Sequence, residues 1–180
     1  MTAFERTFPT VLHIEGGYSN NPNDAGAATK YGITERVARA NGYIGDMRDL
    51  SIEQATRIAK SQYWDVLRLD EIADVDESVA AELFDLSYNM GVAIAGDFLQ
   101  RSLNVLNRGA TDYPDMTVDG VVGPVTIAAL KSFVKLRGDG GRRVLLRMIN
   151  CLRGALYISI AEKNPKNETF VYGWISQRIT

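Results

Sequence analysis

One stretch of the chain, from Tyr18 to Thr34, interrupts a pattern that is helical almost everywhere else. This stretch is rich in Asn, Asp, Gly and Ala, and it follows the pair Gly16-Gly17. Glycine pairs end helices, and runs of Asn, Asp and Gly form turns. The sequence therefore predicts a first helix over about residues 2–14 that ends at the glycine pair, followed by turns or a short hairpin.

Elsewhere, apolar residues recur at helical spacing, and signals for helix starts and stops divide the pattern. Three starts are clear: Ser51 with Gln54 forms a capping box, Asp76 is a good N-cap, and Pro124 suits a first helical position. Together the signals predict helices over about residues 34–41, 51–66, 76–90, 98–106, 124–136, 142–162 and 170–179. The predicted fold class is mainly α, a helical domain with a small loop or hairpin region after the first helix.

The composition is that of an ordinary soluble globular protein of 180 residues, with 46% hydrophobic and 23% charged residues. This length suits one domain with a sizeable core. A net charge of −2 argues against a nucleic-acid partner. The densest basic group is Arg142, Arg143, Arg147 and Arg153, which at helical spacing predicts either a solvated helix flank or a contact with an anionic polymer.

The single cysteine, Cys151, lies in an apolar run, where we expect a buried structural thiol. With His13 as the only histidine, the common zinc sites are excluded, and we predict no metal and no cofactor. The sequence shows neither a signal-peptide pattern nor an apolar run long enough to cross a membrane. We therefore expect synthesis in the cytoplasm, without a membrane span.

Two carboxyl groups flank the start of the non-helical stretch. Glu15 stands at the predicted end of the first helix, where the helix dipole and apolar neighbours would raise its pKa and favour the protonated acid. Asp24 stands in a polar turn, where it would stay ionised. Two carboxyls in contrasting environments can hydrolyse a glycosidic bond. From position alone, however, the sequence favours a solvent-exposed glutamate and a turn-forming aspartate.

A wider, ordered set of residues around these carboxyls resembles glycoside hydrolase family 108, whose members are N-acetylmuramidases, many of them phage endolysins, with an α+β lysozyme-like fold. The resemblance is carried by Glu15-Gly16-Gly17-Tyr18, Pro22, Asp24, Gly26, Thr29 and Gly32-Ile33-Thr34. The later segment Val118–Pro124 with Thr126 resembles the predicted peptidoglycan-binding part of the same family. Phe170, Gly173, Trp174 and Arg178 resemble its closing motif.

The resemblance implies that Glu15 is the catalytic acid and that Asp24 with Thr29 handles the attacking water or stabilises the cationic sugar. Ala25 and Ala27 stand where Pro and Gly are more typical of the family, so the loop around Asp24 differs from the usual pattern.

Three further residues are candidates for substrate binding. Asn89, in Tyr88-Asn89-Met90-Gly91, resembles a cleft-facing residue of the family. Its amide could bond an N-acetyl group, or it could simply end its helix. Tyr18 and Tyr31 could stack on sugar rings or pack against the loop.

The predicted activity is hydrolysis of the β-1,4 bond between N-acetylmuramic acid and N-acetylglucosamine in the peptidoglycan glycan strand. A lytic transglycosylase, a chitinase and a non-catalytic wall-binding or secretion-associated protein stay open as alternatives. We expect a monomer with one lysozyme-like domain over 1–180, in which residues 1–107 carry the catalytic motif and residues 108–180 form the peptidoglycan-binding-like helical region. Release to the cell wall or periplasm would then depend on a holin or a similar membrane lesion.

Overall fold

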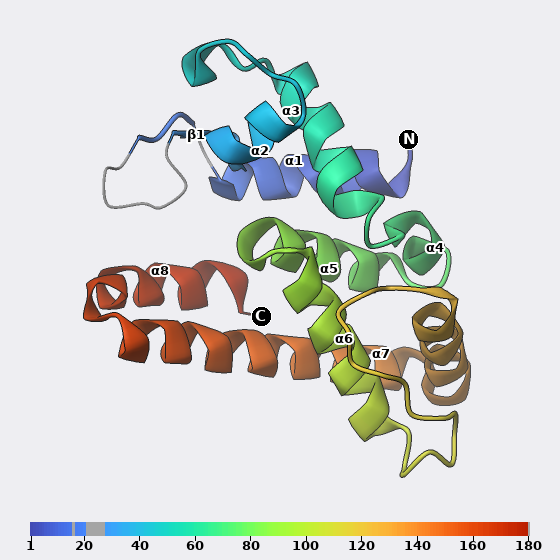
Figure 1. Cartoon of the computed structure of the whole chain (residues 1–180). Coiled ribbons are helices and arrows are strands. Elements are labelled where there is room, and N and C mark those ends of the chain that lie inside the picture. Colours follow the sequence, from blue (N-terminus) through green and yellow to red (C-terminus); the bar gives the residue numbers. More distant parts are fainter. Residues whose placement is uncertain (16, 21–27, 180) are drawn as a thin grey trace. The chain divides into compact units, whose positions relative to one another are not determined.

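The computed structural model describes residues 1–15, 17–20 and 28–179, with the backbone alone for residues 13–15. Its contacts divide the chain into two compact units, Met1–Val92 and Ala93–Thr180. The described elements are mainly helical, as predicted, with one small two-stranded sheet (Figure 1). The expected boundary at 107/108 lies further along the chain than the division after Val92, and the single-domain expectation stays a prediction.

Unit 1 begins with helix α1 (Ala3–Glu15) and a hairpin of strands β1 (Thr29–Lys30) and β2 (Ile33–Thr34). Helix α2 (Glu35–Ala40), the 3-10 turn η1 (Met47–Asp49) and helix α3 (Ile52–Ala59) follow. The π-helical turn η2 (Lys60–Trp64) continues from α3, and α4 (Leu69–Ala73) and α5 (Glu77–Met90) complete the unit. Helix α1 therefore ends where the sequence predicted, within one residue.

The helix-start signals act as expected in unit 1. The Ser51 hydroxyl accepts from the Gln54 amide, and the Gln54 side chain accepts from the Ser51 amide, which completes the capping box of α3. The Asp76 carboxylate accepts from the Val79 amide at the start of α5. Each cap satisfies backbone N–H groups that the first turn of a helix leaves without partners.

Aromatic side chains form the core of unit 1. Phe4 and Phe8 of α1 stack with ring centroids 5.4 Å apart, and Trp64 and Phe84 pack on Phe4 at 5.3 and 5.7 Å. Trp64, which is fully buried, donates from its indole N–H to the Asp70 carboxylate at 2.8 Å. The turn η2 thus places Trp64 against both α1 and α5.

Unit 2 consists of helix α6 (Val92–Leu106), a long loop, helix α7 (Pro124–Lys163), the 3-10 turn η3 (Pro165–Asn167) and helix α8 (Glu168–Arg178). Pro124 occupies the first turn of α7, as predicted. Inside α7, Gly138 adopts φ 55°, so two helical segments meet there. This break agrees with the predicted interruption after Leu136.

Two expectations about α7 are wrong. Arg153 is only 1% exposed and donates to the Arg178 carbonyl at 2.9 Å, so the four arginines do not share one outer face. Cys151 is exposed and not buried. The helix turns Leu145, Ile149 and Tyr157 inward, and a residue two positions from Ile149 falls on another side.

Helix α7 is long and apolar enough, by length and composition alone, to cross a membrane, with a mean hydropathy of 1.4 in its most apolar window. That window is 33% buried. Within unit 2, however, α8 covers part of α7, since Tyr157 and Trp174 pack with centroids 5.3 Å apart. This packing covers part of the long apolar helix, and the expected lack of a membrane span stays a prediction.

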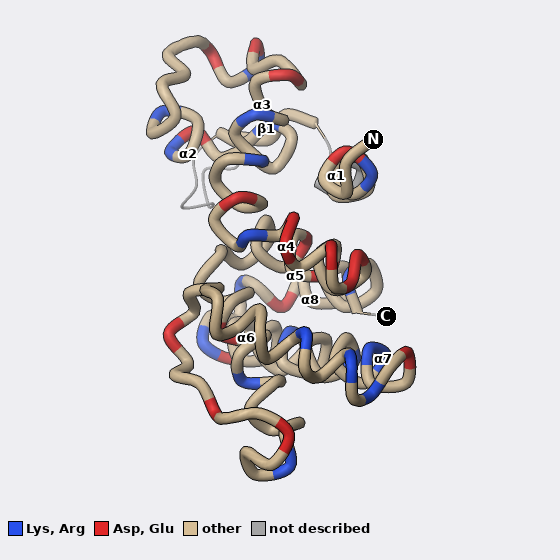
Figure 2. Tube along the Cα trace, turned by 90° about the vertical axis from the view of Figure 1, so that its right-hand side faces the viewer, with Lys and Arg blue, Asp and Glu red and all other residues tan. Residues whose placement is uncertain are grey.

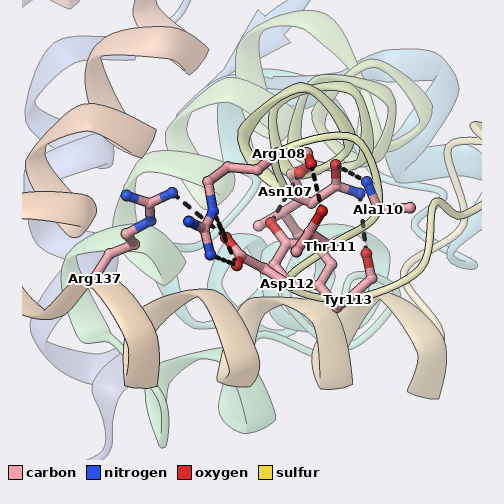
Figure 3. A network of polar contacts seen from close by, with 8 residues as sticks. Asn107, Arg108, Ala110, Thr111, Asp112, Tyr113 and Arg137 are labelled. Atoms are coloured by element: carbon pink, nitrogen blue, oxygen red, sulfur yellow. Dashed lines mark hydrogen bonds and ion pairs between the residues drawn. The ribbon is translucent and has the colours of Figure 1, made fainter.

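Polar side chains, and not strands, organise the loop between α6 and α7. The buried Asn107 donates to the Tyr113 carbonyl and the Asp115 carboxylate, and its oxygen accepts from the Ala110 amide (Figure 3). The Asp112 side chain is 5% exposed and pairs with both Arg108 and Arg137 (Figure 3). Burial raises the pKa of Tyr113 to about 12, and its hydroxyl donates to the Leu103 carbonyl at 2.8 Å.

Asp112→Asn is expected to lower the thermal midpoint of unfolding at neutral pH, because Arg108 and Arg137 lose an anionic partner. The hydrogen bond from Arg108 holds the pKa of Asp112 below its usual 3.8. A carboxyl with a lowered folded-state pKa stabilises the fold above its unfolded-state pKa, and that contribution is lost as the pH falls through the folded-state value.

The gap in midpoint between wild type and Asp112→Asn should therefore be largest near neutral pH and shrink as the pH falls below 3.8. Asp139→Asn, at an 81% exposed side chain in the same unit, is the matched control. Calorimetry across this pH range measures both variants. If the difference in unfolding midpoint between wild type and Asp112→Asn stays constant down to the lowest pH, ionised Asp112 does not stabilise the fold through these arginines.

Gly96 and Gly120 bring two backbone segments of unit 2 into close approach. A Cβ at position 96 would lie 2.1 Å from the Gly120 carbonyl oxygen. Gly96→Ala should therefore lower the free energy of unfolding by about 1–3 kcal/mol. Gly154→Ala, in α7 with nothing within 4 Å of its Cβ, should raise it by about 0.5–1 kcal/mol, as measured by denaturant unfolding. Equal effects of the two substitutions would contradict the close approach.

Candidate functional site

A two-residue turn shapes the hairpin that follows the first helix. Thr29 pairs with Thr34 and Lys30 pairs with Ile33, leaving Tyr31 and Gly32 as the turn. Both turn residues have positive φ, 54° at Tyr31 and 76° at Gly32, as the tightest hairpin turns require. Glycine adopts this conformation without strain, whereas Tyr31 needs support from its surroundings.

Tyr88 of α5 supplies that support. Its hydroxyl donates to the Tyr31 carbonyl at 2.7 Å, and its ring packs on Tyr63 with centroids 4.8 Å apart. Tyr63 belongs to the π-helical turn η2, a type of irregularity that is frequent at functional sites. The turn of the hairpin is therefore fixed to the helical core of unit 1 through a buried side chain.

Thr29 lies between two backbone partners. The amide and carbonyl of Ser19 both bond to Thr29, at 2.8 Å each, while Thr34 pairs with Thr29 on its other side. The bridge between Ser19 and Thr29 closes the ends of the segment between them. Only four positions separate Ser19 from Glu15, which limits the distance between their Cα atoms to about 14 Å.

Four of the six predicted site residues lie in the described part of unit 1. Tyr18 and Thr29 lie at the Ser19 bridge, Tyr31 forms the turn, and half-buried Asn89 directly follows Tyr88 on α5. Glu15 ends α1, but its side chain lies outside the described part of the structure, and so does Asp24 as a whole. Their catalytic roles therefore stay predictions.

A second, more polar group of residues lies beside Tyr18. The Arg48 guanidinium lies over the Tyr18 ring, 5.1 Å from its centroid, and the Lys30 ammonium lies 5.2 Å from the Tyr31 centroid. Lys30 also donates to the Arg48 carbonyl, which joins the hairpin to η1. Among the residues described, no group of three His, Cys, Asp or Glu side chains is placed to hold a metal ion.

Sequence reasoning missed Tyr88 and Arg48. Tyr88 stands in the Tyr88-Asn89-Met90-Gly91 segment that already drew attention to Asn89, so a signal for it existed. Arg48 has no such signal, because its contacts to Tyr18 and Lys30 join residues distant in sequence.

In unit 2, the Val118–Pro124 segment is held by one side chain. The side-chain oxygen of Gln100 accepts from the backbone amides of Asp119 and Gly120 at 3.0 and 2.8 Å. The side-chain nitrogen of Gln100 donates to the Asp119 carboxylate. Asp119 in turn accepts from the Val121 amide at 2.9 Å, so it braces its own loop. The hydrogen bond from Gln100 holds the pKa of Asp119 below its usual range.

Tyr88→Phe removes the hydroxyl that holds the Tyr31 carbonyl and leaves the ring in place. We expect the free energy of unfolding to fall by about 0.5–1.5 kcal/mol. Amide hydrogen exchange should also become faster in the hairpin, because the turn loses its attachment. Tyr172→Phe, at an 86% exposed ring in α8, is the control. Unchanged hairpin exchange in Tyr88→Phe would contradict the positioning role.

Comparison with known proteins agrees with this division of the chain. The family model described as Glycosyl hydrolase 108 matches residues 8–91, and the model described as Predicted Peptidoglycan domain matches residues 94–179. The gap between the two matches falls at the boundary between the two structural units. No curated protein sequence matches the chain.

Among solved structures, SagA from Brucella abortus is similar, with a TM-score of 0.67 and 25% sequence identity over 97% of this chain and 88% of SagA. The likeness therefore covers both units. The hydrolase match contains α1, the hairpin and α5, which are the elements of the candidate site. The chain belongs to glycosyl hydrolase family 108, as a glycoside hydrolase directed at peptidoglycan.

Proposed function

We propose that the chain is an N-acetylmuramidase that hydrolyses the β-1,4 bond between N-acetylmuramic acid and N-acetylglucosamine, with Glu15 as the general acid. The observation that carries the proposal is the position of Glu15 at the last residue of α1, inside the hydrolase match and shortly before Ser19, which pairs with Thr29 of the hairpin. The negative end of a helix dipole disfavours a charged carboxylate, which favours a protonated acid there. Such an acid can protonate the departing glycosidic oxygen.

Asp24 and Thr29 are proposed to act on the other side of the scissile bond. A carboxylate there would orient the attacking water or stabilise the oxocarbenium-like transition state. In support, Thr29 is held between Ser19 and Thr34, which gives its side chain a rigid backbone. Tyr18, Tyr31 and Asn89 are proposed to contact the sugar rings from the hairpin and α5.

The C-terminal unit supports a polymeric substrate, since the peptidoglycan domain matches nearly all of it. Acidic and basic residues are interspersed along both units, as on an ordinary protein surface (Figure 2). We further propose that the protein works as a monomeric, endolysin-like lytic enzyme at the cell wall, which it reaches through a holin-type lesion.

Glu15→Gln is expected to lower the rate of peptidoglycan hydrolysis by at least about 100-fold, because the amide cannot donate the acid's proton. Loss of turbidity of purified walls measures the rate, and circular dichroism checks that the variant is folded. Glu53→Gln, at an exposed glutamate of α3, should leave the rate unchanged.

Mass spectrometry of the muropeptides completes this experiment. Hydrolysis yields reducing N-acetylmuramic acid ends, whereas 1,6-anhydro ends would show transglycosylation and overturn the proposal. An inactive wild type, or a Glu15→Gln variant that clears walls as fast as the wild type, would overturn it as well.

A further inference from the structure

A polar pocket of about 310 Å³ lies in unit 1 beside the hairpin. Its polar lining includes Tyr18, Asn20, Glu35, Arg39, Asp46 and Arg48. These residues come from three separate segments: the chain before the hairpin, helix α2, and the region of η1. None of them belongs to the predicted catalytic set, and of these six only Tyr18 is a predicted sugar-binding residue.

Arg48 is held in this pocket from three directions. The Asp46 carboxylate accepts from the Arg48 backbone amide at 2.8 Å and from its guanidinium at 3.2 Å. The Lys30 ammonium donates to the Arg48 carbonyl, and the Arg48 guanidinium lies over the Tyr18 ring, 5.1 Å from the centroid. The side chain nevertheless stays 65% exposed. Backbone and side chain are thus positioned while the cation faces solvent.

The two arginines of the pocket differ in their hydrogen bonding. Arg39 donates to the carbonyls of Tyr43 and Gly45 and to the Glu35 carboxylate, so it braces α2 and the chain that follows. Within the described residues, the Arg48 guanidinium donates to Asp46 alone, and it does so through Nη1. The Nε and Nη2 donors form the edge that a carboxylate can bind in a two-pronged manner.

We propose that Arg48 binds a carboxylate of the peptidoglycan substrate, with the Tyr18 ring as the platform that orients the guanidinium. The inference rests on the proposed function, because it places the bound glycan near Tyr18, three positions after Glu15. Peptidoglycan carries carboxylates that chitin lacks, either on the lactyl group of muramic acid or on the stem peptide. Arg48 therefore acts as a specificity residue that favours anionic over neutral glycans.

The test compares Arg48→Gln with wild type on three soluble glycans. They are peptidoglycan strands with stem peptides, strands stripped by an amidase to bare the lactyl carboxylate, and peptide-bearing strands whose carboxyls have been capped as methylamides. On the anionic glycan that carries the contacted carboxylate, KM should rise about three- to tenfold while kcat holds, the size expected for one exposed charge-assisted contact. On the capped glycan, wild type and variant should have equal KM.

The pattern over the anionic glycans identifies the source of the carboxylate. A rise in KM confined to peptide-bearing strands assigns the contact to the stem peptide, and a rise on the stripped strands assigns it to the lactyl group. Arg48→Lys, which keeps the charge but lacks the planar fork, should lie between wild type and Arg48→Gln. Arg36→Gln, at an exposed arginine of α2 outside the pocket lining, is the control for net charge.

An equal change in KM on all three glycans would overturn the proposal, because a merely structural role of Arg48 does not depend on substrate charge. Unchanged KM on every glycan would overturn it too. Calorimetric titration with the peptide-bearing and stripped strands separates this inference from the proposed function. If wild type cleaves nothing yet binds these strands more tightly than Arg48→Gln, the function fails and the Arg48 contact stands; equal affinity overturns the contact.

Discussion

The hydrogen bond from the Tyr88 hydroxyl to the Tyr31 carbonyl holds the candidate site together. Each strand of the hairpin has only two residues, and a hairpin of that size is not stable by itself in water. Attachment to α5 turns it into a fixed element, and the Ser19 bridge extends it by a third backbone segment. Thr29 and Tyr18 are positioned through this bridge, so the site depends on a contact between a turn and a helix core.

In unit 2, side-chain amides fix a loop that has no strands of its own. Gln100 and Asn107 are buried, and each bonds to backbone groups of the loop between α6 and α7. A buried amide that satisfies both its donor and acceptor groups fixes a loop without any strand. The Val118–Pro124 segment resembles a peptidoglycan-binding motif. At least Asp119 and Gly120 in it have a structural role, because their amides bond to Gln100. Resemblance to a binding motif and contact with a ligand are separate properties of these residues.

Local signals predicted most of the fold. The caps at Ser51 and Asp76, Pro124 at the start of α7 and the positive-φ glycine at the end of α5 all depend on backbone groups within a few residues, which the sequence displays directly. Two wrong predictions concern burial. Composition alone does not determine which side of α7 faces the core. Cys151 was expected inside and Arg153 outside, whereas Cys151 is exposed and Arg153 is buried with a hydrogen bond to the Arg178 carbonyl of α8.

For function, the sequence by itself determined the reaction class and the catalytic candidates Glu15, Asp24 and Thr29, because an ordered run of residues near one helix end carries the family resemblance. Only the tertiary structure decided which residues support that run. Tyr88 reaches Tyr31 across 57 positions, and Arg48 meets Tyr18 and Lys30 from η1. Spacing along the chain reveals partners that are a helical turn or a hairpin apart, whereas side chains from distant segments meet only when packing brings their elements together.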